Sequence, residues 1–286
     1  MIRYLQPRIT ALVATTLALL FFAGVVSSAA DYDDRLDSLK DYLDRRGYDS
    51  EDLFASPNFE IYDNIDSFFK NSAESKGIRP VNKAKKEQGK AAAAKVFVEQ
   101  LAKYKEHIGF EAKKGYMDEF LEKYIEQLTA SEKKYGVPKE LTAAIIGLES
   151  LFGRILGRHL AFNVYVSMYV KGYKVKWATE QLDELLRFAR KRKRDVFVYN
   201  SSYAGAIGPM QFLPWSLNRW FVGENVTDME DCIMSAANYI AHFKKQRGTF
   251  ERAVFAYNPS KLYVQTILDL AAYAKDACPE KTQEKK

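Results

Sequence analysis

Cysteine and histidine are scarce in this chain of 286 residues, and their scarcity limits the chemistry that it can carry. The three histidines, His107, His159 and His242, lie far apart, and no His or Cys cluster has the spacing of zinc ligands. This argues against a catalytic zinc site. Cys232 and Cys278 are the two cysteines, and an oxidising compartment would permit a disulfide between them. The sequence does not give their separation, so the paired and the free states both remain open.

Charged residues are missing from Ile9 to Val26, a stretch that follows Arg3 and Arg8 and precedes the small residues "SSAA". A basic start, an apolar run and small residues at the end are the layout of a secretory signal peptide. We therefore predict that residues 1–30 are a signal peptide cleaved before Asp31, and that the mature protein is periplasmic or secreted. The alternative is a retained membrane anchor, because the apolar run approaches the length that spans a bilayer.

The excess of positive charge is small once residues 1–30 are set aside. The formal net charge falls from +6 to +4, because this segment holds two arginines and no acidic residue. Mild basicity suits contact with an anionic cell wall or membrane surface, and it is too weak to indicate nucleic-acid binding. A hydrophobic content of 47% is enough for the core of one large or two small domains.

Strand signals are poor throughout, and helical periodicity dominates. Apolar residues at 36, 39 and 43 predict a helix within an N-terminal helical segment, residues 31–70. The polar, Lys-rich residues 71–95 predict a linker that runs into a helix start, and residues 96–277 a helical main domain before a polar tail at 278–286. The best strand candidate is a short hairpin within "RDVFVYNSSYAG". The sequence thus predicts a mainly α-helical fold with a small irregular or β element before Gly205.

Several helix boundaries are marked by the residues that begin and end helices. Gly136 is placed to end one helix, and Pro138 to stand in the first turn of the next. Further helices are expected at 177–193, 228–246 and 262–276.

One carboxylate, Glu149, stands in the apolar run "AAIIGLESLFGR". On a helical wheel it lies about 40 degrees from Ile145, on the apolar face or at its border. Burial there disfavours the charged form and raises the pKa, which keeps a glutamic acid protonated for general acid catalysis near neutrality. The alternative is a glutamate at the helix border that reaches water.

A second feature is the stretch "SSYAGAIGPMQFLPWS", residues 201–216. Its glycines and prolines forbid a regular helix through most of it, while its apolar side chains require burial, so we expect a compact buried loop. Gln211 is the polar side chain in its middle, and a structural turn is the alternative. In "VFAYNPSK", Tyr257 and Asn258 end a helix before Pro259, which is also common turn chemistry.

In this order on a helical chain, "GLESLFGR", "SYAGAIGPMQFLP" and "AYN" together resemble the lytic transglycosylases, most closely glycoside hydrolase family 103, the lytic murein transglycosylase B type. The resemblance implies a lysozyme-like fold and cleavage of the β-1,4 bond between N-acetylmuramic acid and N-acetylglucosamine in peptidoglycan. It also implies that Glu149 is the single catalytic acid and base, that Ser202 and Tyr257 orient it, and that Gln211 and Asn258 bind the sugar. No cofactor and a monomeric protein are expected.

The positions of the Asp and Glu residues agree with a single catalytic carboxylate. No Asp or Glu occurs between Ser150 and Thr179, and residues 201–216 contain none. Ordinary glycosidases use two carboxylates. In the family, the 6-hydroxyl of the muramyl sugar is the nucleophile, and the product is a 1,6-anhydro sugar. The fold can still bring a carboxylate from a distant part of the chain close to Glu149.

The chain departs from the family in several places. "FVGENVTDMEDC" is too short for the acidic calcium loop that the family often has, and residues 241–256 form a shorter stretch than usual. "AFNVYVSMYV" replaces a helix of small residues. The basic cluster at residues 187–195 would suit either an anionic wall polymer or a solvated helix face. Aromatic side chains suit either sugar stacking or the core, and the candidates are Tyr165, Tyr169, Tyr173, Trp215 and Trp220.

Two other functions stay open. A hydrolytic muramidase of the goose-lysozyme kind would need a second acid and would release reducing ends. A non-catalytic wall-binding or scaffold protein would keep the fold without turnover; the shortened loops favour it, and the intact Glu149, Gln211 and Tyr257–Asn258 argue against it.

Overall fold

The computed structural model describes residues 31–65, 67 and 90–277. The predicted signal peptide, most of the predicted linker and the polar tail lie outside the described residues. In the part that is described, a helix over residues 31–45 is followed by α2 and then by the helices of the main domain. These are α2 (Ser50–Ala55), α4 (Lys90–His107), α5 (Phe110–Tyr135), α6 (Lys139–Ser150), α7 (Ala161–Val170), α8 (Val175–Lys191), α9 (Pro214–Trp220), α10 (Met229–Arg247), α11 (Phe250–Tyr257) and α12 (Lys261–Ala277).

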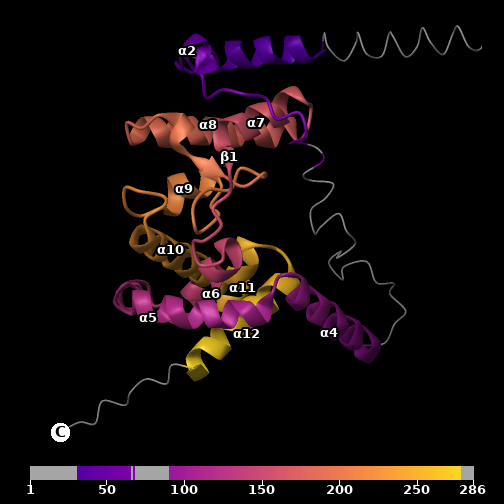
Figure 1. The fold of residues 1–286 in the computed structure, drawn as a ribbon, viewed down its shortest axis with the longest axis vertical. Helices are drawn as coiled ribbons and strands as arrows, with labels where there is room; N and C mark the ends of the chain where they lie inside the picture. Colours follow the sequence, from indigo (N-terminus) through magenta and orange to yellow (C-terminus); the bar gives the residue numbers. More distant parts are fainter. Residues whose placement is uncertain (1–30, 66, 68–89, 278–286) are drawn as a thin grey trace, which may run out of the picture.

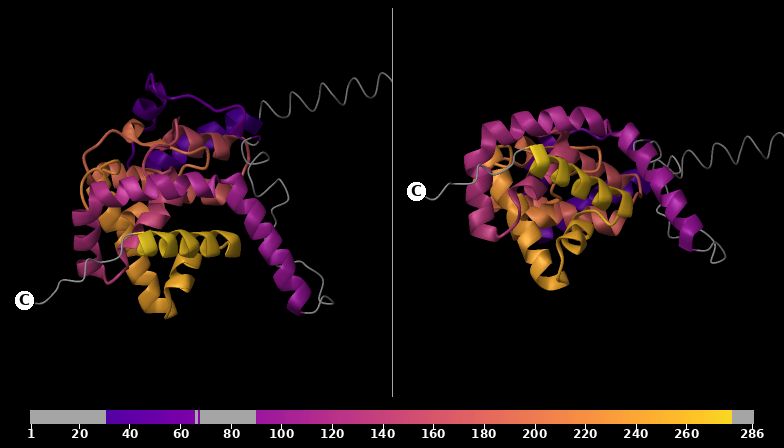
Figure 2. Two further views of the ribbon diagram at one scale, coloured as in Figure 1. Left: turned by 60° about the horizontal axis from the view of Figure 1, so that its bottom comes forward. Right: turned by 90° about the horizontal axis from the view of Figure 1, so that it is seen from below.

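The helices form an upper layer and a lower body, with the irregular segments between them (Figure 1). The helix at 31–45 and α2 lie over α7 and α8, while α5, α6, α10, α11 and α12 make up the lower body. The predicted N-terminal helix is present, and it is tied to the layer below by Arg46, whose Nη1 lies 3.1 Å from Oδ2 of Asp183. Figure 2 shows α5 arching across the lower body and α4 extending from it.

The predicted helix boundaries in the main domain are confirmed to within a few residues. Gly136 ends α5 with a left-handed φ of 65°, and its N–H donates to Glu132 O. Pro138 is the N-cap residue of α6. The expected helices at 177–193, 228–246 and 262–276 correspond to α8, α10 and α12. Apolar periodicity therefore located the longer helices correctly.

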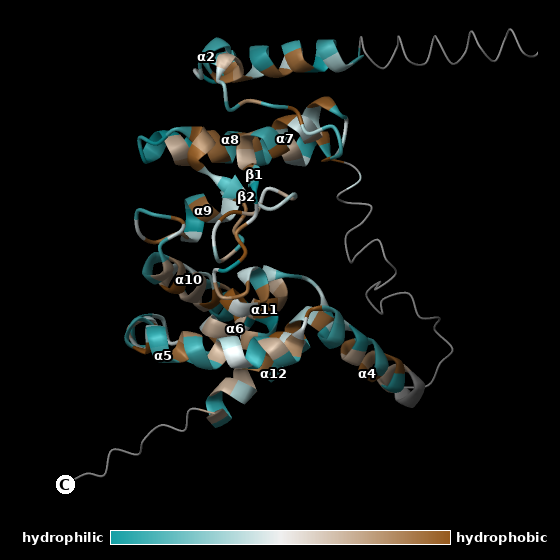
Figure 3. Cartoon of the chain, in the orientation of Figure 1, coloured by the Kyte–Doolittle hydropathy of each residue, from teal (hydrophilic) through white to brown (hydrophobic). Residues whose placement is uncertain are grey.

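Helix α6 lies at the centre of the lower body, packed against α5, α10 and α12. Its residues from Glu140 to Gly147 are all buried, so neighbours surround it on nearly every side. Figure 3 shows apolar residues concentrated where the helices face one another. A helix enclosed in this way gives the side chains in its last turn fixed positions.

The predicted hairpin within residues 194–205 is wrong in its pairing. Val196–Val198 form a 3-10 turn, and β2 (Asn200–Ser201) pairs with β1 (His159–Leu160), which lies about 40 residues earlier in the chain. The register is antiparallel, with His159 opposite Ser201. Strands of two residues carry no alternation, so the sequence held no signal for this partner.

Two further expectations concern the predicted linker and the two cysteines. Helix α4 begins at Lys90, so the helix start that was expected at the end of the linker falls within residues 71–95. Cys232 is fully buried and its Sγ lies 3.4 Å from Val226 O, whereas Cys278 lies outside the described residues and the disulfide is untested. In the described ranges, no helix combines the length and the apolar character that a membrane span needs.

Candidate active site

Glu149 lies in the last turn of α6, directly before the chain reverses. Leu151, Phe152 and Gly153 follow with φ values of 50°, 58° and 81°, three left-handed residues in succession. The reversal folds the Phe152 ring back over Gly147, where a Cβ atom would stand 2.4 Å from the ring. Only a residue without a side chain fits at 147, and the tight turn fixes the end of the helix that carries the carboxylate.

The carboxylate of Glu149 is partly buried and has one phenol as its partner. Tyr263, from the first turn of α12, donates its hydroxyl to Oε1 of Glu149 across 2.6 Å. Burial raises the pKa of Glu149 from 4.5 to about 7, while the hydrogen bond from Tyr263 lowers it. Since desolvation is the larger effect, the group carries a proton for much of the time near neutrality.

Two more tyrosines lie close enough for the charge of Glu149 to act on them. Tyr104 comes from α4 and Tyr257 from the end of α11. Burial and the negative charge of Glu149 raise the pKa of Tyr104 to about 12, and the same two causes raise the pKa of Tyr257 and Tyr263 well above 10. The phenols therefore stay neutral at physiological pH. Of the three, Tyr263 donates its hydroxyl to the carboxylate, while the hydroxyl of Tyr257 donates to Met210 O.

The Gln211 segment is the compact buried loop expected from its composition. Ile207 and Phe212 exchange two backbone hydrogen bonds of 2.8 and 3.0 Å, which close a turn around Gln211. Gln211 has a left-handed φ of 50°, and its Nε2 donates to Gly208 O across 3.0 Å. The hydroxyl of Tyr257 donates to Met210 O, so the loop is fastened to the end of α11.

Ser202 and Asn258 are placed by backbone contacts. The hydroxyl of Ser202 accepts a hydrogen bond from Ala206 N across 3.3 Å, which fixes the turn before the Gln211 loop. Asn258 ends α11, where its N–H donates to Val254 O across 3.1 Å. Ser202 and Tyr257 therefore hydrogen-bond within or to the loop, and the direct hydrogen bond to Glu149 comes from Tyr263.

Tyr263 and Tyr104 were missed in the sequence. Both stand in ordinary amphipathic helices, "KLYVQTIL" and "EQLAKYKEH", where the pattern predicts that an aromatic residue belongs to the core. The interval of six residues from Tyr257 to Tyr263 spans a helix end and a helix start, and no helical periodicity connects them. Only the fold, which brings α4, α6, α11 and α12 together, places the Tyr263 hydroxyl on the Glu149 carboxylate and Tyr104 within the influence of its charge.

The comparison with known proteins identifies the family. The model of the family described as "Transglycosylase SLT domain" matches residues 73–253, which is more than half of the chain. The chain belongs to this family. The match contains Glu149, Ser202 and Gln211 and ends before Tyr257. It confirms the resemblance to lytic transglycosylases that the three motifs indicated.

Individual relatives agree with this family. The chain is 31% identical over 127 residues to membrane-bound lytic murein transglycosylase B of Escherichia coli, a match that covers 42% of this chain. The match spans 35% of that relative's length, or about a third.

Solved structures share the fold at lower identity. The soluble lytic transglycosylase SltB1 of Pseudomonas aeruginosa superposes with a TM-score of 0.67 at 19% identity, over 85% of this chain and 98% of that one. SltB3 of the same organism, in complex with NAG-anhNAM-pentapeptide, gives a TM-score of 0.68 at 16% identity over 85% and 79%. These likenesses confirm the predicted mainly helical, lysozyme-like fold.

The segment that stands where the family often has a calcium loop is tied by its own backbone. Oδ2 of Asp231 accepts hydrogen bonds from Glu224 N and Asn225 N across 2.9 and 3.0 Å. Asp228 caps α10 by accepting from the N–H of Asp231. Among the described residues, no group of three or more His, Cys, Asp or Glu side chains is arranged to hold a metal ion. The carboxylates here act as acceptors for N–H groups, and the donor set does not fit calcium.

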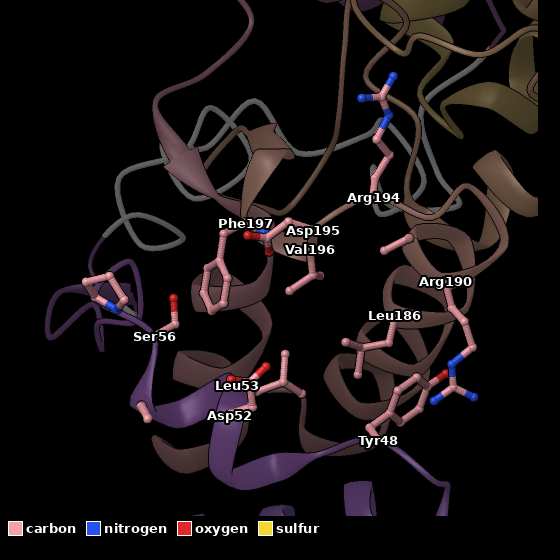
Figure 4. Close-up of a pocket in the computed structure, with 13 residues that line it drawn as sticks. Tyr48, Asp52, Leu53, Ser56, Leu186, Arg190, Arg194, Asp195, Val196 and Phe197 are labelled. Carbon is pink, nitrogen blue, oxygen red and sulfur yellow. The ribbon is translucent and has the colours of Figure 1, made fainter.

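A cavity of about 580 Å³ lies between the N-terminal segment and the end of α8, lined by Tyr48, Leu53, Arg190 and Phe197 among others (Figure 4). No predicted site residue lines it. Arg190 lies over the ring of Tyr48 at 3.9 Å and donates to Gly47 O across 2.6 Å. This arginine from the basic cluster therefore holds the N-terminal segment in place.

Proposed function

We propose that this protein is a lytic transglycosylase that cleaves the β-1,4 bond between N-acetylmuramic acid and N-acetylglucosamine in peptidoglycan. The observation that carries the proposal is Glu149 itself, a partly buried carboxyl group with a pKa of about 7. Among the described residues, the influences that shift this pKa are burial and Tyr263, and no second carboxylate contributes. A neighbouring acid at the distance used by retaining glycosidases would raise the pKa through its charge.

In the first step, protonated Glu149 donates its proton to the glycosidic oxygen while the bond from that oxygen to C1 of the muramyl sugar breaks. The developing positive charge on the sugar is shared between C1 and the ring oxygen. After it has given up its proton, Glu149 is a carboxylate, and the Tyr263 hydroxyl stabilises this charged form through its hydrogen bond.

In the second step, the 6-hydroxyl of the same sugar attacks C1, and the Glu149 carboxylate takes its proton. The new bond from O6 to C1 gives the 1,6-anhydro product, and Glu149 is again protonated. No water is consumed, so one carboxylate serves as acid and then as base. A pKa near 7 suits both tasks, because neither protonation state is strongly disfavoured at neutral pH.

The other site residues support these steps in the proposal. Gln211, on its rigid left-handed turn, and Asn258, at the end of α11, bind the sugar beside the scissile bond. Ser202 and Tyr257 orient the site through the loop that they hold, and Tyr263 orients the carboxylate directly. The hydroxyl of Tyr257 is fixed on Met210 O, one residue from Gln211, so the two roles are linked.

The location of the substrate determines where the enzyme must act. The substrate lies outside the cytoplasm, which agrees with the signal-like residues 1–30, so we place the mature protein in the periplasm or outside the cell. We also propose that it acts as a monomer on glycan strands and needs no cofactor, because the described chemistry uses only its own side chains.

Mass spectrometry of the muropeptides released from purified murein by residues 31–286 tests the function, with Glu149→Gln as control. We expect fragments that end in 1,6-anhydromuramic acid from the wild type and almost none from the variant. Reducing-end fragments would instead show a hydrolytic muramidase with a second acid. Retained murein binding without any product would favour the scaffold function.

A further inference from the structure

The five aromatic residues considered for sugar stacking differ in exposure, and Tyr169 and Tyr173 are half-buried. Tyr165 is fully buried and Trp220 is 7% exposed, whereas Trp215 is 40% exposed. Tyr165 also donates its hydroxyl to Gly205 O across 2.8 Å, which fixes it as a core residue. Tryptophan is enriched at binding interfaces, because its ring offers a large apolar area together with one polar N–H group.

Trp215 is held rigidly despite its exposure. It stands in the first turn of α9, and its backbone N–H donates to Oε1 of Gln181 across 3.1 Å. The Arg219 guanidinium lies 4.1 Å from the centroid of its ring, and the Trp220 ring meets it at 5.0 Å and 69°. Since the ring is already ordered, a ligand that contacts it costs little additional side-chain entropy.

Arg219 is fixed in turn by a buried acid. Its Nη1 lies 3.1 Å from Oε1 of Glu184, whose side chain is buried, and also donates to Trp215 O across 2.9 Å. Both of these hydrogen bonds use Nη1, and guanidinium has five N–H groups in all. The tryptophan and the arginine thus form one preorganised unit on the surface of α9, apolar on one part and cationic on the other.

A row of aromatic rings links this unit to the catalytic carboxylate. Trp215 contacts Trp220 at 5.0 Å, Trp220 contacts Tyr239 at 4.7 Å, and Tyr239 contacts Tyr257 at 4.7 Å between ring centroids. Tyr257 in turn lies near enough to Glu149 for its pKa to be raised by that charge. Trp215 also follows Gln211 by only four residues, a Cα separation of at most about 15 Å.

Basic side chains lie on α10, the helix that packs against α9, in addition to the Glu184 carboxylate that pairs with Arg219. His242 is exposed and lies against the Trp220 ring at 5.4 Å, and Arg247 lies 5.2 Å from the ring of Phe243 on the same helix. The end of α10 carries Lys244, Lys245 and Arg247. Muramyl sugars carry a lactyl carboxyl group, free or extended by a peptide, so aromatic and cationic groups side by side match their two characters.

We propose that Trp215 and Arg219 form a distal sugar-binding subsite, which holds a muramyl sugar of the bound strand beyond the two sugars at the scissile bond. The inference rests on the proposed function. Trp215 supplies apolar contact with the sugar, and Arg219 donates to an acidic group on it. The subsite binds the strand equally before and during bond cleavage, so it acts on KM and not on kcat.

The test measures kcat and KM for murein oligomers of two, four, six and eight sugars. Trp215→Ala is expected to raise KM for the longer oligomers about 3- to 10-fold, the size of one aromatic contact, with kcat unchanged. The two-sugar fragment is the reference, because it is too short to reach the scissile site and the distal subsite together. Its KM should therefore be the same in the wild type and in Trp215→Ala. Ile125→Ala, which removes a side chain of 39% exposure from α5, serves as the matched control and leaves both constants unchanged.

A second measurement does not depend on turnover. In the Glu149→Gln background, tryptophan fluorescence is titrated with murein hexamers and with N-acetylglucosamine hexamers, which lack the lactyl group. Trp215→Ala weakens binding of both hexamers, while Arg219→Gln weakens the murein hexamer alone. If the wild type cleaves nothing but these titrations behave as stated, the proposed function fails and the subsite stands.

Two results would overturn the subsite. One is an unchanged KM at every length in Trp215→Ala. The other is an equal loss of kcat/KM at every length together with a lower melting temperature, which would make Trp215 a structural residue of α9. The conservative Trp215→Phe keeps an aromatic face and is expected to fall between the wild type and Trp215→Ala only if contact with the sugar is the cause.

Discussion

The hydroxyl of Tyr263 donates to Oε1 of Glu149 across 2.6 Å and joins the first turn of α12 to the last turn of α6. The two residues are 114 positions apart in the chain. Their contact sets two properties of the carboxylate at once, its direction and its affinity for a proton. Burial raises the pKa of Glu149 to about 7, and the phenol opposes that rise.

Removing this phenol should shift the pH dependence of the reaction. In Tyr263→Phe the charged form of Glu149 loses its hydrogen bond, so the pKa of Glu149 rises above its wild-type value of about 7. The alkaline limb of kcat/KM against pH then moves to higher pH. Because the carboxyl group is less firmly oriented, we also expect kcat at pH 6 to fall roughly 10-fold.

The control for that variant is Tyr239→Phe, which removes a hydroxyl that donates to Ala256 O and not to the carboxylate. It is expected to lower stability slightly and to leave the pH profile in place. An alkaline limb that stays at the wild-type pH in Tyr263→Phe would show that the phenol does not tune Glu149.

The Glu149 carboxyl group should lower the stability of the protein above neutral pH. Its folded-state pKa of about 7 lies above its unfolded value of about 4.5, so the folded state binds the proton more tightly. Below pH 4.5 the group is neutral in both states and costs nothing. Between pH 4.5 and 7 the cost grows as the unfolded chain ionises first, and above pH 7 it is constant.

Glu149→Gln removes that cost while keeping an oxygen for Tyr263. Relative to the wild type, its free energy of unfolding should be unchanged at pH 4 and higher at pH 8, by about 1–3 kcal/mol. Urea unfolding at pH 4, 6 and 8 measures the difference. A gain of the same size at pH 4 and pH 8 would contradict the assignment of the shifted pKa to Glu149.

The sequence predicted those parts of the structure that depend on local chemistry. Gly136 and Pro138 marked a helix boundary by backbone preference, and the apolar run around Glu149 predicted a carboxyl group at the edge of the core. The partners of that carboxyl group depend on tertiary packing. Tyr104 and Tyr263 have the same local pattern as core tyrosines, so they were not predicted. The pairing of β1 with β2 was missed for the same reason.

Gly147 provides a test of the turn that follows Glu149. In Gly147→Ala the new Cβ atom meets the Phe152 ring, which is held by left-handed backbone on both sides and by contact with the Phe120 ring at 5.2 Å. We expect the variant to be about 1–3 kcal/mol less stable and less active, because the end of α6 must shift.

A double-mutant cycle separates this clash from a general effect of alanine. Phe152→Ala alone is strongly destabilising, since it empties a core position. In that background Gly147→Ala should be neutral or stabilising by up to about 1 kcal/mol, the helix preference of alanine over glycine. Equal costs of Gly147→Ala in both backgrounds would exclude the ring as the cause.

The loop before α10 should be stable without metal, because its backbone is held by Asp231. The two N–H groups of Glu224 and Asn225 point to one carboxylate oxygen, and Gly223 allows the close approach, since a Cβ there would stand 2.1 Å from Asp231. A chelator should therefore leave the melting temperature unchanged. Calcium at roughly 5 mM, which is enough to fill weak sites, should also leave it unchanged.

Asp231→Ala should cost about 1–2 kcal/mol in the free energy of unfolding, since two N–H groups lose their acceptor. Asp231→Asn keeps an oxygen acceptor and should cost less. A melting temperature that falls with chelator and recovers with calcium would mean that these carboxylates bind a cation and that the hydrogen bonds are secondary.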